Sequence, residues 1–294
     1  MSELVRGRSL GEAWLNTLRR VNSAPTGELV HVLTSVSEPW LPEDPAIRAA
    51  LDEALVPRGT GARSRLQTVD TIANTIFPWS LYPDPVDAWS PEPDADNSTV
   101  DAAAERLYTN YAYIFTRLGE AHHENKKGTY FSRMISWPGK EMGQFNQIAK
   151  RIAHLRVQNN PEHHKSAFNA GDIAVSEPGL DLASTSDVGD LGMNTYAAND
   201  NRTRSFPCLV HVDVGLFQDK INLLGVYRHQ FLIQKGYGNM IGLARLQRFL
   251  AQQTGYGVGE LAIQATLATS EQGTFGKRGV DRLIHANLQP DLGF

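Results

Sequence analysis

One cysteine, one arginine and one asparagine have the types and the spacing to do chemistry together. Cys208 is the only cysteine among 294 residues, and it follows Pro207 at the start of an alternating apolar run. Arg228 lies twenty residues further on, and Asn239 lies eleven residues after that, behind a glycine-rich stretch. A thiolate is a strong nucleophile, a guanidinium binds an anion, and a carboxamide offers a donor beside an acceptor. This set indicates covalent chemistry on the base of a nucleotide.

Each of these residues also has an ordinary structural interpretation. A lone cysteine at the start of a strand is commonly a small core residue, and a single arginine commonly forms a structural ion pair. An asparagine before a helix commonly caps it. The spacing from Cys208 to Arg228 and Asn239 favours a nucleotide site over these interpretations. Asn239 can serve as helix cap and base reader at once.

The composition sets the class of protein. With 41% hydrophobic and 20% charged residues, the chain can bury a substantial core. Its apolar runs fall short of a transmembrane span, and its N-terminus lacks the long apolar segment of a secretory signal. A single cysteine forms no internal disulfide, which fits a reducing cytosol. The net charge of −4 and the scarcity of basic runs argue against nucleic-acid binding. We therefore expect a cytoplasmic protein that binds neither membranes nor nucleic acid.

Apolar periodicity predicts the elements of the N-terminal half. Helices are expected over residues 10–21, 45–55, 66–77, 100–118 and 144–155, a strand over 27–36 and a loop over 58–63. Residues 82–98, rich in proline and acidic side chains, are expected to form an exposed excursion. Residues 178–205, polar and poor in large apolar side chains, are expected to form a mobile loop. Neither segment is interpreted as a domain boundary, so a single domain over residues 1–294 is predicted.

The elements after Phe206 are the most regular, and they must position the three residues. Strands are expected over residues 208–216, 221–228 and 260–269, and a helix over residues 239–254. Cys208 then opens one strand, Arg228 closes the next, and Asn239 lies at the helix entry. Gly255 stands where a helix stop is expected.

This order and spacing resemble the thymidylate synthases and their relatives, the pyrimidine nucleotide hydroxymethylases. In that family a Pro-Cys motif supplies the nucleophile, an arginine on the next strand binds phosphate, and an asparagine eleven residues later reads the base. Pro207-Cys208, Arg228 and Asn239 match this pattern. Further matches are Gly128-Thr129-Tyr130, Trp137, the 144–148 helix and Ser166-Ala167-Phe168-Asn169. The similarity covers roughly residues 128–271 and, weakly, 10–36.

The resemblance implies an α/β (α+β) fold of thymidylate synthase type, with a large mixed β-sheet flanked by helices. It implies a homodimer, because in the family two such sheets pack back to back. The implied ligand is a pyrimidine nucleoside monophosphate of uracil type. The implied reaction is transfer of a one-carbon unit, methyl or hydroxymethyl, to C5, with a folate as the donor.

The resemblance also implies roles for single residues. Cys208 would add to C6 of the ring and make C5 a carbon nucleophile, and the cation of Arg228 would favour the thiolate. Arg228, together with His229, would hold the phosphate. Asn239 would donate to O4 and accept from N3–H, which matches uracil and mismatches cytosine. Tyr130 would contact the substrate.

The chain departs from the family pattern at several positions. Leu209 follows the nucleophile in place of a histidine, His229 and Phe231 replace a serine and an aspartate, Pro161-Glu162-His163-His164-Lys165 replaces paired arginines, and Thr269 and Glu271 replace the histidine and tyrosine that hold the sugar. Asp70 is the nearest candidate for the family's catalytic glutamate, with a surface helical aspartate as the alternative. The chain stops at Phe294, before the segment that closes over folate, so the one-carbon donor is left open.

Two other classes of function stay open. The first is a catalytically lapsed homologue that binds a nucleotide or a partner protein. The second is a subunit that completes its site with a different chain. His122-His123-Glu124 and His163-His164 resemble metal ligands only superficially, because neighbouring side chains point to different sides of a regular element, and no metal site is predicted.

Overall fold

The computed structural model describes residues 3–59, 66–121, 125, 128–137, 141–159, 193–195 and 207–285. The strands are β1 (Glu3–Gly7), β2 (Glu28–Val36), β3 (Met193–Asn194), β4 (Leu209–Phe217), β5 (Lys220–Phe231) and β6 (Gly257–Thr269). The helices are α1 (Leu10–Asn22), α2 (Pro45–Ala54), α3 (Val69–Ile76), α4 (Ser98–Ala121), α5 (Tyr130–Ile135), α6 (Gln147–Asn159), α7 (Tyr237–Thr254), α8 (Gln272–Phe275) and α9 (Lys277–His285). A 3-10 turn, η2 (Trp79–Leu81), and a π-helical segment, η5 (Leu232–Gly236), complete the described elements.

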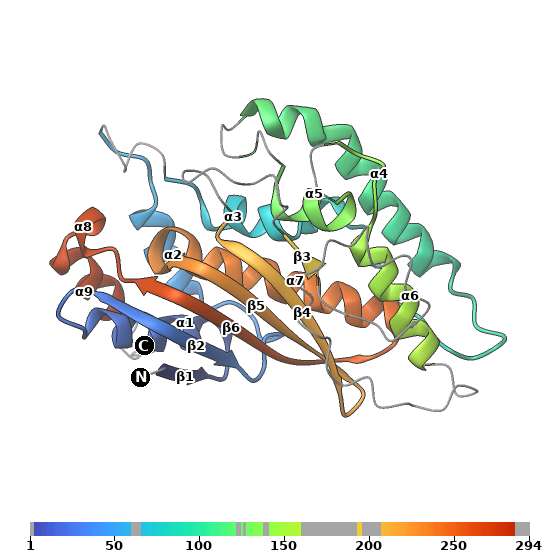
Figure 1. Cartoon of the computed structure of the whole chain (residues 1–294), viewed down its shortest axis with the longest axis horizontal. Helices are drawn as coiled ribbons and strands as arrows, with labels where there is room; N and C mark the ends of the chain where they lie inside the picture. The colour runs from blue at the N-terminus through green and yellow to red at the C-terminus, as the bar shows by residue number, and fades with distance from the viewer. Residues whose placement is uncertain are drawn as a thin grey trace, which may run out of the picture. The chain divides into compact units, whose positions relative to one another are not determined.

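The strands form one mixed sheet in the order β1-β2-β6-β5-β4-β3 (Figure 1). β1 runs parallel to β2, whereas β2 pairs antiparallel with β6, and β3 pairs antiparallel with β4. Helices flank this sheet (Figure 1). The predicted α/β class with a mixed sheet and flanking helices is therefore confirmed.

The helices and strands predicted from periodicity are found, with bounds that shift where a cap overrides the pattern. α3 begins later than residue 66 because the Thr68 hydroxyl accepts a hydrogen bond from the Thr71 N–H at 3.2 Å. α6 begins later than residue 144 because Asn146 Oδ1 accepts a hydrogen bond from the Ala149 N–H at 2.9 Å. Both are N-cap bonds, which fix where a helix starts.

Several elements are not predicted by the sequence, namely β1, η5, α5, α8 and α9. Most of the expected loop at 178–205 lies outside the described residues. Within it, Met193–Asn194 form β3 and pair with β4. The expected loop at 58–63 is described only as far as Gly59, and residues 161–165 and 166–169 lie outside the described residues.

The chain divides into two compact units. The first comprises Met1–Asn74, Val226–Ala244 and Glu260–Phe294, and the second comprises Thr75–Gly225 and Arg245–Gly259. In the first unit, α1 packs on β1 and β2 and buries Trp14, Leu18 and Val21. The Trp14 ring lies 5.6 Å from the ring of Tyr237, measured between centroids. Burial of these large apolar side chains is the main stabilising contribution to this unit.

Aromatic rings form the core of the second unit. Phe77 lies 5.1 Å from Phe249 and 5.6 Å from Phe131, between ring centroids. Tyr82 meets Phe249 edge to face at 5.0 Å. Tilted and edge-to-face contacts at these separations are favourable beyond the buried area alone. The cluster joins the segment before η2, helix α5 and helix α7 inside this unit.

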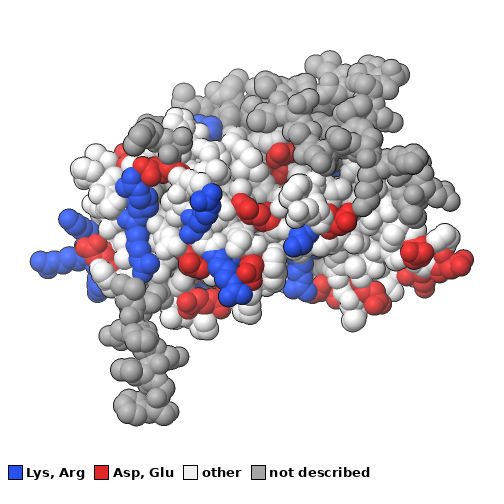
Figure 2. Space-filling model, turned by 90° about the horizontal axis from the view of Figure 1, so that it is seen from below, with Lys and Arg blue, Asp and Glu red and all other residues white. Residues whose placement is uncertain are grey.

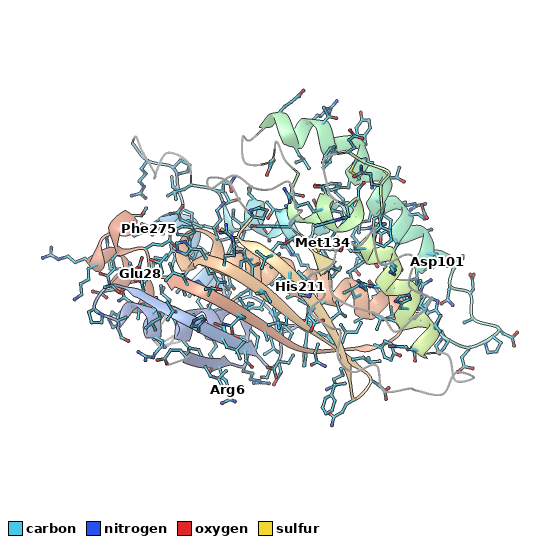
Figure 3. The ribbon with its side chains drawn as sticks, viewed as in Figure 1. Arg6, Glu28, Asp101, Met134, His211 and Phe275 are labelled. Atoms are coloured by element: carbon cyan, nitrogen blue, oxygen red, sulfur yellow. The ribbon has the colours of Figure 1, made fainter. Side chains whose placement is uncertain are left out.

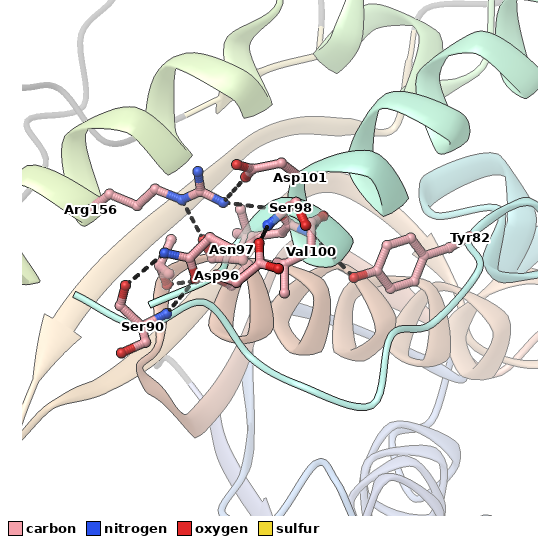
Figure 4. A network of polar contacts seen from close by, with 11 residues as sticks. Tyr82, Ser90, Asp96, Asn97, Ser98, Val100, Asp101 and Arg156 are labelled. Atoms are coloured by element: carbon pink, nitrogen blue, oxygen red, sulfur yellow. Dashed lines mark hydrogen bonds and ion pairs between the residues drawn. The ribbon is translucent and has the colours of Figure 1, made fainter. Parts of the chain in front are cut away.

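The expected excursion at residues 82–98 is largely exposed, and polar contacts anchor it to the end of α7 (Figure 4). The Tyr82 hydroxyl donates to Gln252 Oε1 at 2.8 Å, and the Trp89 N–H donates to the Gln252 carbonyl at 2.9 Å. Asn97 links two parts of this segment. Its Oδ1 accepts a hydrogen bond from the Ser90 N–H at 2.8 Å, and its Nδ2 donates to the Ser90 carbonyl at 2.8 Å. The segment is therefore a fixed part of the second unit.

Charged side chains of both signs are interspersed among the described residues on the face shown in Figure 2. Among the described residues, no helix combines the length and the apolar character that crossing a membrane requires.

Gly238 lets the first turn of α7 approach α3 closely inside the first unit. A Cβ placed on Gly238 would lie 2.7 Å from Ile72 Cβ and 2.8 Å from the Val69 carbonyl oxygen. The Val69 carbonyl belongs to the main chain and cannot rotate away. Glycine is therefore required at this position, one residue before Asn239.

We expect Gly238→Ala to destabilise the protein by about 1–3 kcal/mol, because the added methyl group would force α7 and α3 apart. Urea unfolding of the variant and the parent measures this loss. The matched control is Gly273→Ala in α8, where a Cβ would meet no atom within 4 Å. Equal unfolding midpoints for Gly238→Ala and the parent would contradict the close approach of α7 and α3.

Candidate functional site

Cys208 lies directly before β4 and is half-buried rather than enclosed in the core. The Cys208 N–H donates to the Tyr130 hydroxyl oxygen at 3.2 Å, and the N–H of Leu209 donates to the same oxygen at 3.3 Å. The structure thus brings together two of the residues that the sequence singles out. A partly accessible thiol on a fixed main chain has the setting that a nucleophile needs.

Tyr130 is held by the buried start of α5. Thr129 caps this helix, because its hydroxyl accepts a hydrogen bond from the Ser132 N–H at 3.2 Å. The same hydroxyl is hydrogen-bonded to the Tyr111 hydroxyl of α4. Burial raises the pKa of Tyr130 well above its ordinary value, and the neighbouring Cys208 acts in the same direction. The Tyr130 hydroxyl therefore stays protonated at neutral pH.

A buried arginine, Arg133, lies in the same part of the second unit. It is 4% exposed, and its Nη1 donates to the Thr195 carbonyl at 3.0 Å. The Thr195 hydroxyl in turn donates to the Leu209 carbonyl. His211, the histidine nearest to the nucleophile on β4, is buried as well (Figure 3). The main chain on both sides of Leu209 is therefore fixed by polar contacts.

Arg228 and His229 lie in the first unit near the end of β5. Arg228 is exposed, whereas His229 is half-buried and its ring stacks on Phe231 at 4.1 Å between centroids. Burial lowers the pKa of His229, the charge of Arg228 lowers it further, and Glu28 at the start of β2 opposes the shift (Figure 3). His229 is therefore neutral at physiological pH, and Arg228 is the cation of this pair.

Asn239 is buried in the first turn of α7, with 5% of its surface exposed. Because α7 begins at Tyr237, Asn239 lies inside the helix, and its predicted role as the cap is wrong. The reason is that the π-helical segment η5 runs directly into α7, so helical hydrogen bonding starts before Asn239. The Asn239 carboxamide makes no hydrogen bond to another described residue.

Segment η5, Leu232–Gly236, connects the strand that carries Arg228 to the helix that carries Asn239; we call it the connector. The Trp14 indole N–H of α1 donates to the Leu232 carbonyl at 2.7 Å. Lys235 Nζ donates to Gln67 Oε1 at 3.1 Å. π-Helical turns are rare and are frequently found at functional sites.

Glu271 holds the connector at its centre. Its Oε2 accepts hydrogen bonds from the N–H groups of Ile233, at 2.7 Å, and of Gln234, at 2.9 Å. Glu271 has a left-handed backbone, with φ of 62°, and its own N–H donates to the Thr269 hydroxyl at 3.1 Å. The next residue back, Ser270, is bonded to the Gly27 carbonyl, which fixes the turn after β6. Left-handed glutamates are uncommon and are retained where surrounding contacts determine them.

The Glu271 carboxyl is buried, with 6% of the residue exposed, and its Oε1 has no hydrogen-bond partner among the described residues. Burial raises the pKa of Glu271 to about 7, against the lowering effects of the Gln234 and Ile233 hydrogen bonds and of the Lys235 charge. The group therefore titrates near neutrality. In the sequence, Glu271 stands out only as a departure from a family pattern. Neither its burial nor its hydrogen bonds to the connector can be inferred from the neighbouring residues.

Asp70 of α3 lies in the first unit as an ion-pair partner. Its carboxylate binds Arg48 of α2, and Arg48 also binds Asp52 at 2.9 Å and Glu43 at 3.2 Å. The Asp70 side chain is half exposed. An ion pair with an arginine of a neighbouring helix is a structural role, so the structural interpretation of Asp70 gains support and its catalytic role stays a prediction.

Comparison of the sequence with protein-family models and with curated proteins finds no match. Within the part of the chain that the structure describes, no group of three or more His, Cys, Asp or Glu side chains could hold a metal ion. His122-His123-Glu124 and His163-His164 lie outside that part.

We expect Tyr130→Phe to destabilise the protein by about 1–3 kcal/mol, because the N–H groups of Cys208 and Leu209 lose their acceptor. The looser main chain should also let iodoacetamide alkylate Cys208 faster. Urea unfolding and mass spectrometry of the alkylated protein measure the two effects. The control is Tyr113→Phe on α4, at a side chain that is 74% exposed. A Tyr130→Phe variant with the stability and alkylation rate of the control would contradict this role.

The buried carboxyl of Glu271 predicts a pH dependence of stability. Its pKa is about 7 in the folded protein, against 4.5 ordinarily, so the folded state binds more protons between these values. Stability contributed by Glu271 is therefore full below pH 4.5 and falls as the pH rises through 7. Glu271→Gln cannot ionise, so from about pH 5 to about pH 8 its stability relative to the parent should rise by about 3 kcal/mol. Parallel stability curves over that range would refute the buried titration.

Proposed function

We propose that this chain binds a pyrimidine nucleoside monophosphate and modifies C5 of a uracil-type ring, with Cys208 as the nucleophile. The observation that carries the proposal is the setting of Cys208: a half-buried thiol, before a strand, on a main chain fixed by the Tyr130 hydroxyl. A cysteine that only filled the core would be enclosed by apolar side chains.

The covalent step is an addition followed by an elimination. The Cys208 thiolate forms a bond to C6, and the electrons of the C5–C6 double bond move to C5 and O4 as an enolate. C5 then bonds an electrophile, either a proton or a one-carbon unit. Loss of the original C5 hydrogen as a proton restores the double bond and expels the thiolate. With a proton as the electrophile, the net result is exchange of the C5 hydrogen with solvent, which requires no cofactor.

Three residues of the first unit support a nucleotide as the ligand. Arg228 is an exposed guanidinium, suited to bidentate contact with a phosphate. His229 is neutral and can contribute a hydrogen bond without a charge. The Asn239 carboxamide is buried and unused by other described residues, so its donor and acceptor remain for the O4 and N3–H of uracil.

A thymidylate synthase-like fold and a homodimer belong to the same proposal, together with a cytoplasmic location. The order of β4, β5, α7 and β6 supports this fold, because it carries the nucleophile, the arginine and the asparagine in the family's order, with eleven residues between the last two. The one-carbon donor is a folate by resemblance alone.

One observation favours a second candidate function, a nucleotide-binding homologue without turnover. Asp70, the nearest candidate for the catalytic glutamate, is engaged by Arg48. Without a group that moves protons at C5, the protein would bind the nucleotide and leave it unchanged.

The test is the release of tritium from C5 of dUMP and of UMP. We expect the parent to catalyse release, and Cys208→Ala to abolish it while still binding the nucleotide, because the thiolate forms the adduct and Arg228 and Asn239 form the binding contacts. Equilibrium dialysis measures the binding. Tyr113→Phe, at an exposed side chain of α4, serves as the control variant. Binding without release by the parent would support the second function, and neither binding nor release would refute both.

A further inference from the structure

We propose that Glu271 is a positioning residue of the nucleotide site: its side-chain carboxyl holds the connector, Leu232–Gly236, and thereby fixes Arg228 and Asn239 relative to each other. The inference rests on the proposed function, because it concerns the residues that would hold the phosphate and the base. It assigns to Glu271 no contact with the nucleotide.

The first support is the place of the hydrogen bonds. Ile233 and Gln234 open a helical stretch, and the first N–H groups of such a stretch have no carbonyl partner within it. Glu271 Oε2 accepts from both groups, at 2.7 Å and 2.9 Å, from 38 and 37 residues away in the sequence. Phe231, the residue before the connector, makes no side-chain cap hydrogen bond. The Glu271 carboxyl caps the connector in its place.

The second support is how firmly the Glu271 main chain is held. Its left-handed backbone is unfavourable for a glutamate. It persists because Thr269 accepts the Glu271 N–H and the Glu271 carbonyl accepts the N–H groups of Thr274 and Phe275. Because the Glu271 main chain is fixed, its carboxyl group can hold the Ile233 and Gln234 N–H groups in fixed positions.

The third support is the Oε1 atom, which is buried without a hydrogen-bond partner among the described residues. A buried carboxyl with one bonded and one unbonded oxygen resists ionisation, because the two bonds to the connector only partly compensate the buried charge. The charged group that acts on this carboxyl is Lys235 of the connector, and Gln67, which binds Lys235, is neutral. Ionisation favours release of the carboxyl to solvent, so the hold on the connector should weaken as the pH rises through neutrality.

The test compares UMP and dUMP binding by the parent, Glu271→Gln and Glu271→Asp, from about pH 6 to about pH 8. We expect the ratio of the Glu271→Gln to the parent Kd to be near unity at the acid end. It should fall roughly five-fold or more by the alkaline end, because only the parent ionises at residue 271 and loses the fixed connector. The phosphate of the ligand titrates equally with both proteins, so the ratio isolates Glu271. Glu271→Asp is too short to reach both N–H groups and should bind weakly at every pH.

The control variant is Glu53→Gln on α2, an exposed glutamate of the same unit. Its Kd ratio to the parent should stay flat across the pH range. A flat ratio for Glu271→Gln as well, with parental affinity for Glu271→Asp, would overturn the positioning role.

Hydrogen exchange at the Ile233 and Gln234 amides separates this inference from the proposed function. In the parent, protection of these two amides beyond the intrinsic pH effect should decrease as the pH rises through neutrality, because ionised Glu271 favours the opened connector, and in Glu271→Gln it should not decrease. If the parent binds no uracil nucleotide, the proposed function fails while the exchange result still decides whether Glu271 holds the connector. If the parent binds and the two proteins exchange alike, the inference fails and the proposed function stands.

Discussion

The pair of hydrogen bonds from the connector to Glu271 is the contact on which the arrangement of the first unit depends. β5 and α7 would otherwise be joined by a five-residue π-helical turn whose first N–H groups lack partners. Glu271 supplies the acceptor, Trp14 binds the carbonyl of Leu232, and Lys235 is tied to Gln67. These anchors come from α1, from the turn after β6 and from the segment before α3. Together they define where the strand ends and where the helix carrying Asn239 begins.

In the second unit, a tyrosine side chain likewise accepts hydrogen bonds from two consecutive main-chain N–H groups. The Tyr130 hydroxyl accepts two consecutive N–H groups, those of Cys208 and Leu209, just before β4 continues into the sheet. Each unit therefore fixes the entry to one element with a buried oxygen from a distant part of the chain. Without the Tyr130 or the Glu271 oxygen, these main-chain N–H groups would lose their hydrogen-bond acceptor. This need explains why a polar side chain is placed at each of these two positions.

Much of the fold followed from the sequence, because apolar periodicity reports burial directly. α1, β2, α4, β5, α7 and β6 all carry such a pattern and were predicted with small errors in their bounds. α3 and α6 begin later than predicted, because the side chains of Thr68 and Asn146 cap these helices. The site was only partly predictable. The resemblance named Tyr130 as a substrate contact, but it did not predict the hydrogen bonds of Tyr130 with the main chain of Cys208 and Leu209. The hydrogen bonds of Glu271 to Ile233 and Gln234 were not predicted either, because contacts between residues so far apart in the sequence produce no periodic pattern.

Four of the residues that depart from the pattern of the proposed family lie in two contacting pairs. The serine and aspartate of the family correspond to His229 and Phe231, whose rings stack at 4.1 Å between centroids. The histidine and tyrosine correspond to Thr269 and Glu271, and here the Glu271 N–H donates to the Thr269 hydroxyl. Such contacts maintain packing and hydrogen bonding around these positions, so each of the two pairs is consistent with the local structure that contains it.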